Sequence, residues 1–409
     1  MRLSNLRTFS LQMLILFSLL DSSGDYLLVS ETGIISTASQ IFRLALTMSL
    51  LISVVAGLLD IKRLILLHPF AKFILIINII VIIYSLFLGV ISNNSLNAIR
   101  ESISFMLLAI IPTLLSVNHK SREKIFIFFI NSLVWVCFSK IIIAQLGQVL
   151  LYGVPSWKVF LKISPILVVP YAYYLIKFAS EKFQARTLLL LSIVIFEILI
   201  AQARSLNISV VLVSIFILIR PNKLKTLAFS VGLILILGAG SMYITDMDFS
   251  SAFGIWSGDH FENSANYRID QLHILIERFQ SRPLSGFGFG FYTSGYSSYG
   301  ELDIPYQLEL DLVNFASKTG FIMFSMYAIG YILIWFYFNS LKKNNSQSCE
   351  FLLTSFISIF SLLFYSLFQN LHSSILFWIY YSLFFSMIFS AKSHIPSNIV
   401  LQRQRIFSN

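Results

Sequence analysis

Residues 70–92 read FAKFILIINIIVIIYSLFLGVIS, and the only charged residue among them is Lys72. A helix rises about 1.5 Å per residue, so roughly 20 residues of this kind cross the ~30 Å hydrocarbon core of a bilayer. The bilayer core offers the backbone no water, whereas a helix satisfies its own backbone hydrogen bonds. The stretch therefore predicts a membrane-spanning helix.

Similar apolar runs recur along the whole chain of 409 residues. With 57% hydrophobic and 12% charged residues, the chain is too apolar for a soluble globular protein, in which about a quarter of the residues are charged. The predicted fold class is all-α: a polytopic integral membrane protein in which residues 1–409 form one transmembrane domain. We expect about twelve transmembrane helices, approximately at residues 5–20, 38–59, 70–92, 99–117, 125–149, 160–179, 187–203, 206–219, 224–244, 310–338, 351–370 and 373–391.

The first apolar run has features of a signal peptide, because Arg2 and Arg7 precede it. The residues that follow, DSSG at 21–24, lack the spaced small residues of a cleavage site. We therefore expect an uncleaved first helix.

The net charge of +10 follows the pattern of a membrane protein rather than that of a nucleic-acid-binding surface. Basic residues fall in alternate connectors and in both tails, as at 120–124 and 342–343, whereas acidic residues gather in the connectors between them. Connectors rich in lysine and arginine stay on the cytoplasmic side. The pattern predicts that both termini are cytoplasmic, that the long polar loop at 245–308 is on the outer side, and that no nucleic acid binds.

Cysteines and histidines give no sign of a disulfide framework or a metal site. Cys137 lies within an expected span and Cys349 lies beside a cytoplasmic turn, so the two are not expected to pair. The six histidines show no metal-binding spacing. We therefore predict neither a metal nor another cofactor.

Three charged residues lie where a membrane protein tolerates charge poorly. Lys140 falls near the middle of the fifth span, where a lysine costs about 2.5–3.5 kcal/mol unless it snorkels or faces a cavity or a partner. Glu197 lies in the seventh span, and Arg204 lies seven residues on, which places both on one face of a continuous helix. Arg204 occupies a tight outer connector, where it either bonds lipid phosphate or holds a phosphate or pyrophosphate bidentately.

The long loop contains an amphipathic helix of about four turns, which we expect within residues 266–282. Its apolar residues recur at helical spacing, from Ile269 to Phe279. Arg268, Arg278 and Arg282 fall toward the other side. The helix either lies in the headgroup plane or caps the transmembrane bundle, and its charged side is otherwise an ordinary solvated face.

A glycine-rich run and two carboxylates complete the loop. After Pro283 come Gly286, Gly288 and Gly290, and glycines at every second position permit positive φ or close backbone approach. The run is no dinucleotide-binding fingerprint, because no βαβ unit surrounds it. Glu309 and Asp311 stand at the mouth of the tenth span, where a carboxylate serves either as a general base or as a neutralising partner for the arginines.

Taken together, these residues resemble the O-antigen polymerase and O-antigen ligase superfamily of bacterial membrane glycosyltransferases. The matching features are Arg204-Ser205 in a tight outer connector, Arg268 on a helix of the late outer loop, the Arg-Pro-x-x-Gly-x-Gly-x-Gly run from Arg282 to Gly290, and a polar residue eleven before Gly320. The topology matches throughout, but the motifs cover a short part of the chain and each is degenerate.

The resemblance implies a site at the outer face of the bacterial inner membrane. Members transfer glycans from undecaprenyl pyrophosphate carriers, with arginines where other enzymes use a metal ion. It implies catalytic roles for Arg204 and Arg268, with Glu309 as the base, or else Asp311 or Asp303. The other residues expected to contact substrate are Arg278, Arg282, Gly286, Gly288, Gly290, Asp311 and Lys140.

Position 309 favours one branch of the superfamily. Ligases typically carry a histidine there, whereas this chain has Glu309, so we expect a polymerase that joins lipid-linked oligosaccharide repeats. Its expected partners are the undecaprenyl-pyrophosphate-linked oligosaccharide, membrane lipids and a chain-length regulator protein. The alternatives are a ligase that transfers polysaccharide to lipid A core, and a lipid-linked oligosaccharide flippase. Lys140 and Glu197 suit a flippase, but the arginine-bearing loop and the absence of a sequence repeat do not.

Overall fold

The apolar runs of the chain fold into helices. The computed structural model describes residues 3–20, 33–59, 69–93, 95–117, 119–152, 164–180, 184–201, 204–218, 259–291, 296–297, 300–301, 310–342, 349–366 and 375–390. Within these ranges the regular structure is helical except for one antiparallel pair of two-residue strands, β1 (Tyr296–Ser297) and β2 (Gly300–Glu301). The all-α prediction is confirmed for the described part of the chain.

The helices follow the expected spans closely. The first half contains α1 (Leu3–Leu20), α2 (Gly33–Leu59), α3 (Pro69–Ser92), α4 (Ser95–Ser102), η2 (Ile103–Ile110), α5 (Ile111–Ser116), α6 (His119–Tyr152), η3 (Ser164–Leu167), α7 (Val168–Ser180), α8 (Ala185–Ala201) and α9 (Arg204–Leu218). The second half contains α12 (Asp259–Ser281), α13 (Asp311–Lys342), α14 (Cys349–Tyr365) and α15 (Ile375–Ser390). The expected span at 224–244 lies outside the described residues.

Several helices have the length and apolarity of membrane spans. Among the described residues, four meet both criteria: Pro69–Ser92, Ser95–Leu115, Lys120–Leu146 and Asp311–Phe338. The second of these comprises α4, η2 and α5 and contains a 3₁₀ segment, with Pro112 at the start of α5. Proline has no N–H to give to a helical hydrogen bond, so it is tolerated in a first turn. The helices support an α-helical membrane protein.

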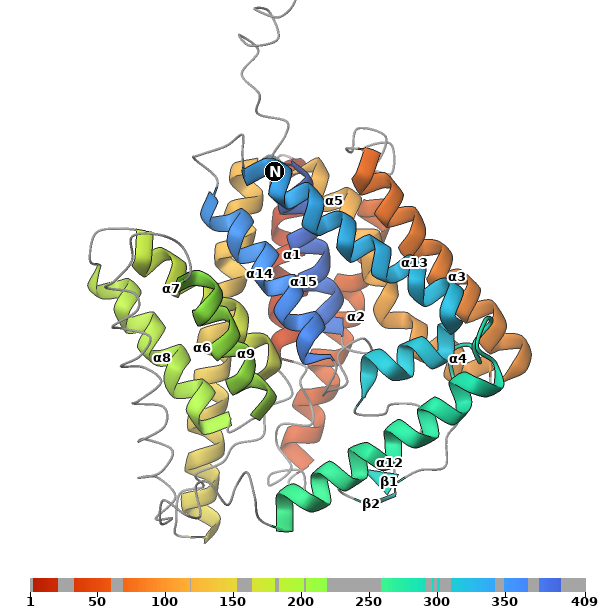
Figure 1. Cartoon of the computed structure of the whole chain (residues 1–409). Coiled ribbons are helices and arrows are strands. Elements are labelled where there is room, and N and C mark those ends of the chain that lie inside the picture. The colour runs from red at the N-terminus through yellow and green to blue at the C-terminus, as the bar shows by residue number, and fades with distance from the viewer. Residues whose placement is uncertain are drawn as a thin grey trace, which may run out of the picture.

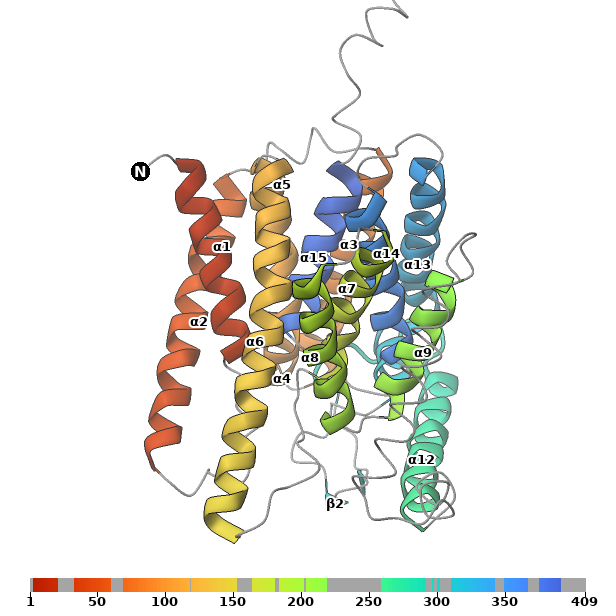
Figure 2. The ribbon, with the colours of Figure 1, turned by 90° about the vertical axis from the view of Figure 1, so that its left-hand side faces the viewer.

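The helices form a bundle with α12 across one end. Figures 1 and 2 show the bundle helices side by side, with α12 at the bottom and the start of α1 at the top. α1 packs on α2 and α6, α3 packs on α13, and α14 packs on α7 and α15. The start of α1 and the long-loop helix α12 therefore lie at opposite ends of the bundle.

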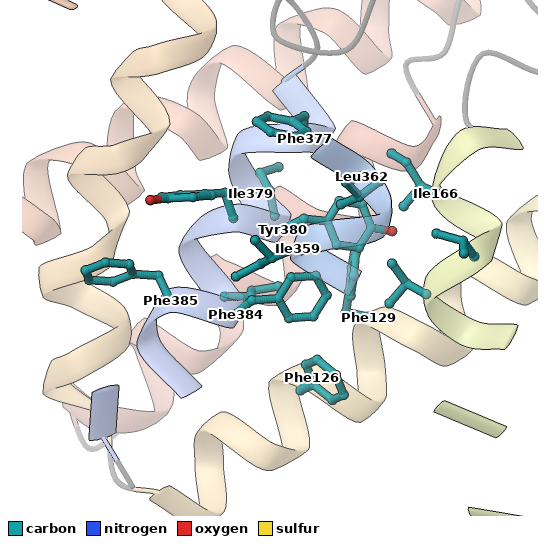
Figure 3. Packing of buried hydrophobic residues seen from close by; sticks show 14 of the residues in the cluster. Phe126, Phe129, Ile166, Ile359, Leu362, Phe377, Ile379, Tyr380, Phe384 and Phe385 are labelled. Carbon is teal, nitrogen blue, oxygen red and sulfur yellow. The ribbon is translucent and has the colours of Figure 1, made fainter. Parts of the chain in front are cut away.

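α15 lies in the middle of the bundle. Its residues 377–389 are all buried, as expected for a helix that is apolar on every side. Tyr380 packs edge-to-face on Phe129 of α6 with ring centroids 4.1 Å apart, and Phe384 packs on Phe126 at 5.6 Å. Figure 3 shows these rings between α15 and α6. Such aromatic pairs add to the dispersion contacts that hold helices together inside a bilayer.

The outward faces of α2 and α3 expose continuous apolar rows. The exposed side chains are Leu44, Met48, Leu51, Ile52, Val55, Leu58 and Leu59 on α2, and Phe73, Ile76, Ile80, Ile83, Phe87 and Ile91 on α3. Soluble proteins rarely leave apolar patches of this extent uncovered. Rows of this kind are suited to contact with lipid chains, which agrees with the composition of the spans.

One expectation about a single helix is wrong, and another helix contains a bend. Glu197 and Arg204 do not share a helix face, because α8 ends at Ala201 and α9 begins at Arg204 itself. The tenth span is present as α13, and Gly320 inside it has non-helical backbone, with φ 73° and ψ 169°. A non-helical residue interrupts the ladder of backbone hydrogen bonds and bends the helix. This bend shapes the candidate site.

Candidate functional site

The glycine-rich run after α12 forms a compact turn that we call the hook, residues 283–291. α12 ends at Ser281, just before Pro283, and the residue before a proline disfavours helical backbone. Gly286, Gly288 and Gly290 have φ of 71°, 81° and 72°. The expected positive φ at these three glycines is confirmed.

The hook lies in direct contact with the backbone of three helices. A Cβ atom on Gly288 would overlap the backbone of Gly89 on α3. The hook and α3 are therefore in backbone contact at these two glycines. A Cβ atom on Gly286 would meet α13 in the same way, and one on Gly290 would meet α4. Only glycines allow both this approach and the positive φ.

The bend in α13 provides acceptors for the hook. In a regular helix the N–H of Phe321 would bond the carbonyl of Ser317, but here it bonds the carbonyl of Pro283 at 2.7 Å. The carbonyl of Ser317 instead accepts from the N–H of Phe287 at 3.2 Å, and that of Lys318 accepts from Gly288 at 2.8 Å. The hook therefore satisfies backbone groups that the bend leaves open.

The other side of the hook is bonded to α3 and to the turn that follows it. The N–H of Phe289 donates to the carbonyl of Ser85 at 2.9 Å. The side-chain amide of Asn93 donates to the carbonyls of Phe287 and Phe289, at 2.8 and 3.1 Å. The ring of Phe289 is fully buried and stacks on Phe105 with centroids 5.1 Å apart. The hook is thus part of the packed interior.

A buried ion pair lies beside the hook. Nζ of Lys318 on α13 lies 2.5 Å from Oε1 of Glu101 on α4, and the two side chains are 3% and 10% exposed. Oε2 of Glu101 accepts the N–H of Gly290 at 2.7 Å. One carboxylate therefore joins α4, α13 and the hook.

Two arginines of the loop stack on phenylalanines of the hook. The guanidinium carbon of Arg278 lies 4.9 Å from the ring centroid of Phe291, and that of Arg282 lies 5.0 Å from the ring centroid of Phe287. Such contacts fix the guanidinium plane and leave its edge for an anion. Burial lowers the pKa of Arg278 to about 10, so the group remains cationic at neutral pH.

α12 buries one of its sides against the protein. Gln271 and Leu275 are buried, whereas Ile269, Leu272 and Ile276 are exposed. The prediction of an amphipathic helix is confirmed, and the helix starts at Asp259, earlier than expected. The polar residues of α12 are divided, because Gln271 is buried and Arg278 is half-buried whereas Asp270, His273 and Glu277 are exposed.

Arg268 lies on α12, but the position of its side chain is outside the described part of the chain. Residues 271, 275 and 278 are spaced by three or four positions, which places them along one side of a helix. Gln271 and Leu275 show that this side faces the protein. Arg278 and Arg282, whose guanidinium groups both stack on phenylalanines of the hook, are called the arginine row.

Only some of the other predicted site residues lie in the described part of the chain. Asp311 lies buried in the first turn of α13, whereas Glu309 and Asp303 lie outside the described residues. Arg204 is the first residue of α9, and the position of its side chain is outside the described part. Nζ of the buried Lys140 donates to the carbonyl of Leu19 at 2.9 Å, so this lysine has a partner at the end of α1.

Sequence patterns did not identify Glu101, Lys318 or Asn93. The available signal was weak: an acid at the start of the fourth span and a base near the start of the tenth. Such residues are common at the ends of spans, where charges reach the interface. Only the tertiary structure, in which α3 packs on both α4 and α13, brings the two charges together.

An apolar groove of about 440 Å³ lies between α13 and α14. Its lining includes Phe324, Tyr327, Ala328, Tyr331 and Trp335 of α13 and Phe360 of α14. α13 is one of the helices long enough to span a membrane, and the side chain of Trp335 is 41% exposed. The groove can therefore take a hydrocarbon chain.

Comparison with models of known protein families found no match for this chain, and none was found among curated proteins.

Proposed function

We propose that the chain is a polysaccharide polymerase of the bacterial inner membrane, which moves a growing glycan from undecaprenyl pyrophosphate onto a lipid-linked oligosaccharide repeat. The observation that carries the proposal is the arginine row, whose two guanidinium groups stack on phenylalanines of the hook at one end of the bundle. A row of guanidinium groups suits a pyrophosphate, because each guanidinium can donate two parallel hydrogen bonds to one phosphate group.

The reaction requires one bond to form and one to break. The hydroxyl of the acceptor sugar attacks the anomeric carbon of the donor glycan, and the bond from that carbon to the pyrophosphate oxygen breaks. The hydroxyl proton passes to a carboxylate, for which Glu309 is the first candidate and Asp311 the second. Undecaprenyl pyrophosphate leaves with the electron pair, and the arginines stabilise its developing charge.

The positions of Asp311 and the groove are compatible with this assignment. Asp311 is the first residue of α13. The hook is hydrogen-bonded to the bend of this helix, and α12 contacts the same helix. The groove between α13 and α14 is apolar and suits the lipid part of the substrate. Arg204 would add a further cation from the start of α9.

Two alternative functions use parts of the same site. A ligase would need the same grip on pyrophosphate but would deliver the glycan to lipid A core. A flippase would need charges that line a central path; Lys140 was a candidate, and its bond to Leu19 supplies a structural reason for its burial. We therefore keep the polymerase as the proposal.

Two experiments test the polymerase proposal. In the first, a deletion strain is analysed for its surface and lipid-linked glycans, separated by size. Collapse of the ladder to a single repeat on its normal acceptor supports a polymerase. Long chains stranded on the lipid carrier would mean a ligase, and single repeats trapped on the cytoplasmic face would mean a flippase.

In the second experiment, purified protein is given lipid-linked repeats in detergent, without any gradient. Elongation by the wild-type protein, and its loss on Arg204→Ala, would support the assignment of the arginine. Lys124→Ala is the matched control, since Lys124 is an exposed cation at the start of α6. Unchanged polymer length and yield with Arg204→Ala would remove Arg204 from the site.

A further inference from the structure

The buried pair of Glu101 and Lys318 contacts the hook in two ways. Lys318 accepts the N–H of Gly288 through its carbonyl, and its ammonium group is held by Glu101. Glu101 in turn accepts the N–H of Gly290. The carboxylate of Glu101 therefore holds the amide of Gly290, and the main chain of Lys318 holds the amide of Gly288 two residues away.

The two charges depend on one another. Both side chains are at least nine-tenths buried, and a buried charge that loses its partner is strongly destabilising. Loss of either side chain would leave the other charge in a site that excludes water. The lowest free energy would then be reached by moving the hook away, so that water reaches the remaining charge.

The hook also contacts both guanidinium groups of the arginine row. Arg282 stacks on Phe287 and Arg278 stacks on Phe291, and both phenylalanines flank the amides that the pair holds. A displaced hook would therefore displace the two guanidinium groups. A misplacement of about 1 Å in a group that contacts the substrate can cost roughly a hundredfold in rate.

We propose that the Glu101–Lys318 pair is a latch that sets the position of the arginine row for the pyrophosphate of the substrate. Glu101 and Lys318 are then positioning residues, which act through the hook without touching substrate. The inference rests on the proposed function for its ligand, but the latch itself has a separate readout.

Amide hydrogen exchange measured by mass spectrometry tests the latch on the full-length protein. Glu101→Leu removes both the charge and the acceptor for Gly290, whereas Glu101→Gln keeps an acceptor. We expect exchange in segment 283–291 to be about a hundredfold faster in Glu101→Leu and less affected in Glu101→Gln. Glu277→Gln removes an exposed carboxylate of α12 and is the control, with wild-type exchange. Unchanged exchange of α6 would show that the bundle is folded.

The second readout is kinetic. In Glu101→Leu we expect the KM for lipid-linked donor to rise at least about tenfold, with a smaller fall in kcat. Faster exchange with unchanged KM and kcat would overturn the proposal, because the pair would then hold the hook without positioning the site. Unchanged exchange of the hook would overturn it as well.

A third measurement separates failure of the latch from failure of the proposed function. If the wild-type protein does not elongate lipid-linked sugar, the proposed function fails, and inorganic pyrophosphate then serves as the probe. Protection of segment 269–282 by pyrophosphate in the wild type, and its loss in Glu101→Leu, would support the latch. Equal protection in the two proteins, or protection in neither, would overturn it.

Discussion

Replacement of Gly288 by alanine should release the hook from the bundle. Gly288 has φ 81°, and a Cβ atom there would overlap the backbone of Gly89 on α3. Rotation of a side chain cannot relieve this overlap, because the atoms that the new Cβ would meet are backbone atoms of α3. The hook must therefore move away from α3 as a whole.

The cost can be worked out from the contacts that would be lost. Left-handed backbone costs an L-residue about 1–2 kcal/mol. Movement of the hook would break the bonds from Gly288 to Lys318 and from Phe289 to Ser85, at about 1 kcal/mol each. The total, roughly 3–4 kcal/mol, corresponds to a hundred- to thousandfold rise in local opening.

Hydrogen exchange of segment 283–291 measures this opening directly. Gly330→Ala is the matched control, because Gly330 lies in the regular part of α13 and a Cβ atom there would lie 3.5 Å from Cγ2 of Ile74. An alanine inside a helix is favoured over glycine by about 0.5–1 kcal/mol. We expect Gly330→Ala to leave the hook at wild-type exchange rates.

The reasoning would be refuted if Gly288→Ala exchanged like the wild-type protein in this segment. The hook would then be able to accept a side chain, and the close approach to Gly89 would not be required. Equal acceleration in Gly288→Ala and Gly330→Ala would be a different failure, since it would trace the effect to α13 in general.

Three further predictions concern the arginine row and the groove. Arg278→Ala should lower the transfer rate roughly a hundredfold in an elongation assay, because about 2.7–4 kcal/mol of charge stabilisation is lost. The control Lys124→Ala should match the wild type. A fall of less than threefold in Arg278→Ala, or about 0.7 kcal/mol, would remove this residue from the site. Ala328→Trp fills the groove and should raise the KM for lipid-linked donor. Ile329→Trp, at an exposed position outside the groove lining, should leave the KM unchanged. Equal KM values in the two variants would argue against a lipid chain in the groove. Since burial lowers the pKa of Arg278 only to about 10, its charge is present at neutral pH and is lost as the pH rises through that value. A pH–rate profile with an alkaline loss near neutral pH that disappears in Arg278→Ala would contradict this assignment.

Several elements were predictable because their cause is local. The apolar run at 70–92 predicted α3 (Pro69–Ser92) almost to the residue, since a backbone without water must bond within itself. The spacing of apolar residues predicted the helix in the long loop, although its start at Asp259 was missed because residues 259–265 lack a clear apolar period. The three glycines of the hook predicted positive φ, because no other residue adopts that backbone as readily.

The candidate site was only partly predictable. The arginines and glycines were identified, but Glu101 and Lys318, which hold them, were not. The pair is separated by 217 residues, and neither residue has a neighbour in sequence that reveals its partner. The direction in which α12 faces was left open by the sequence, because a mixed helix has two candidate sides and the choice depends on what it packs against.

The sequence by itself therefore determined which segments are helical, where the chain turns on glycine and where its cations gather. Each of these depends on local backbone hydrogen bonding, conformational freedom or hydropathy. Only the tertiary structure decided which residues meet: the bend at Gly320 that opens acceptors for the hook, the side of α12 that faces the bundle, and the ion pair beside the hook. These depend on how distant helices pack, and packing free energy is a sum over many contacts that no single stretch of sequence contains.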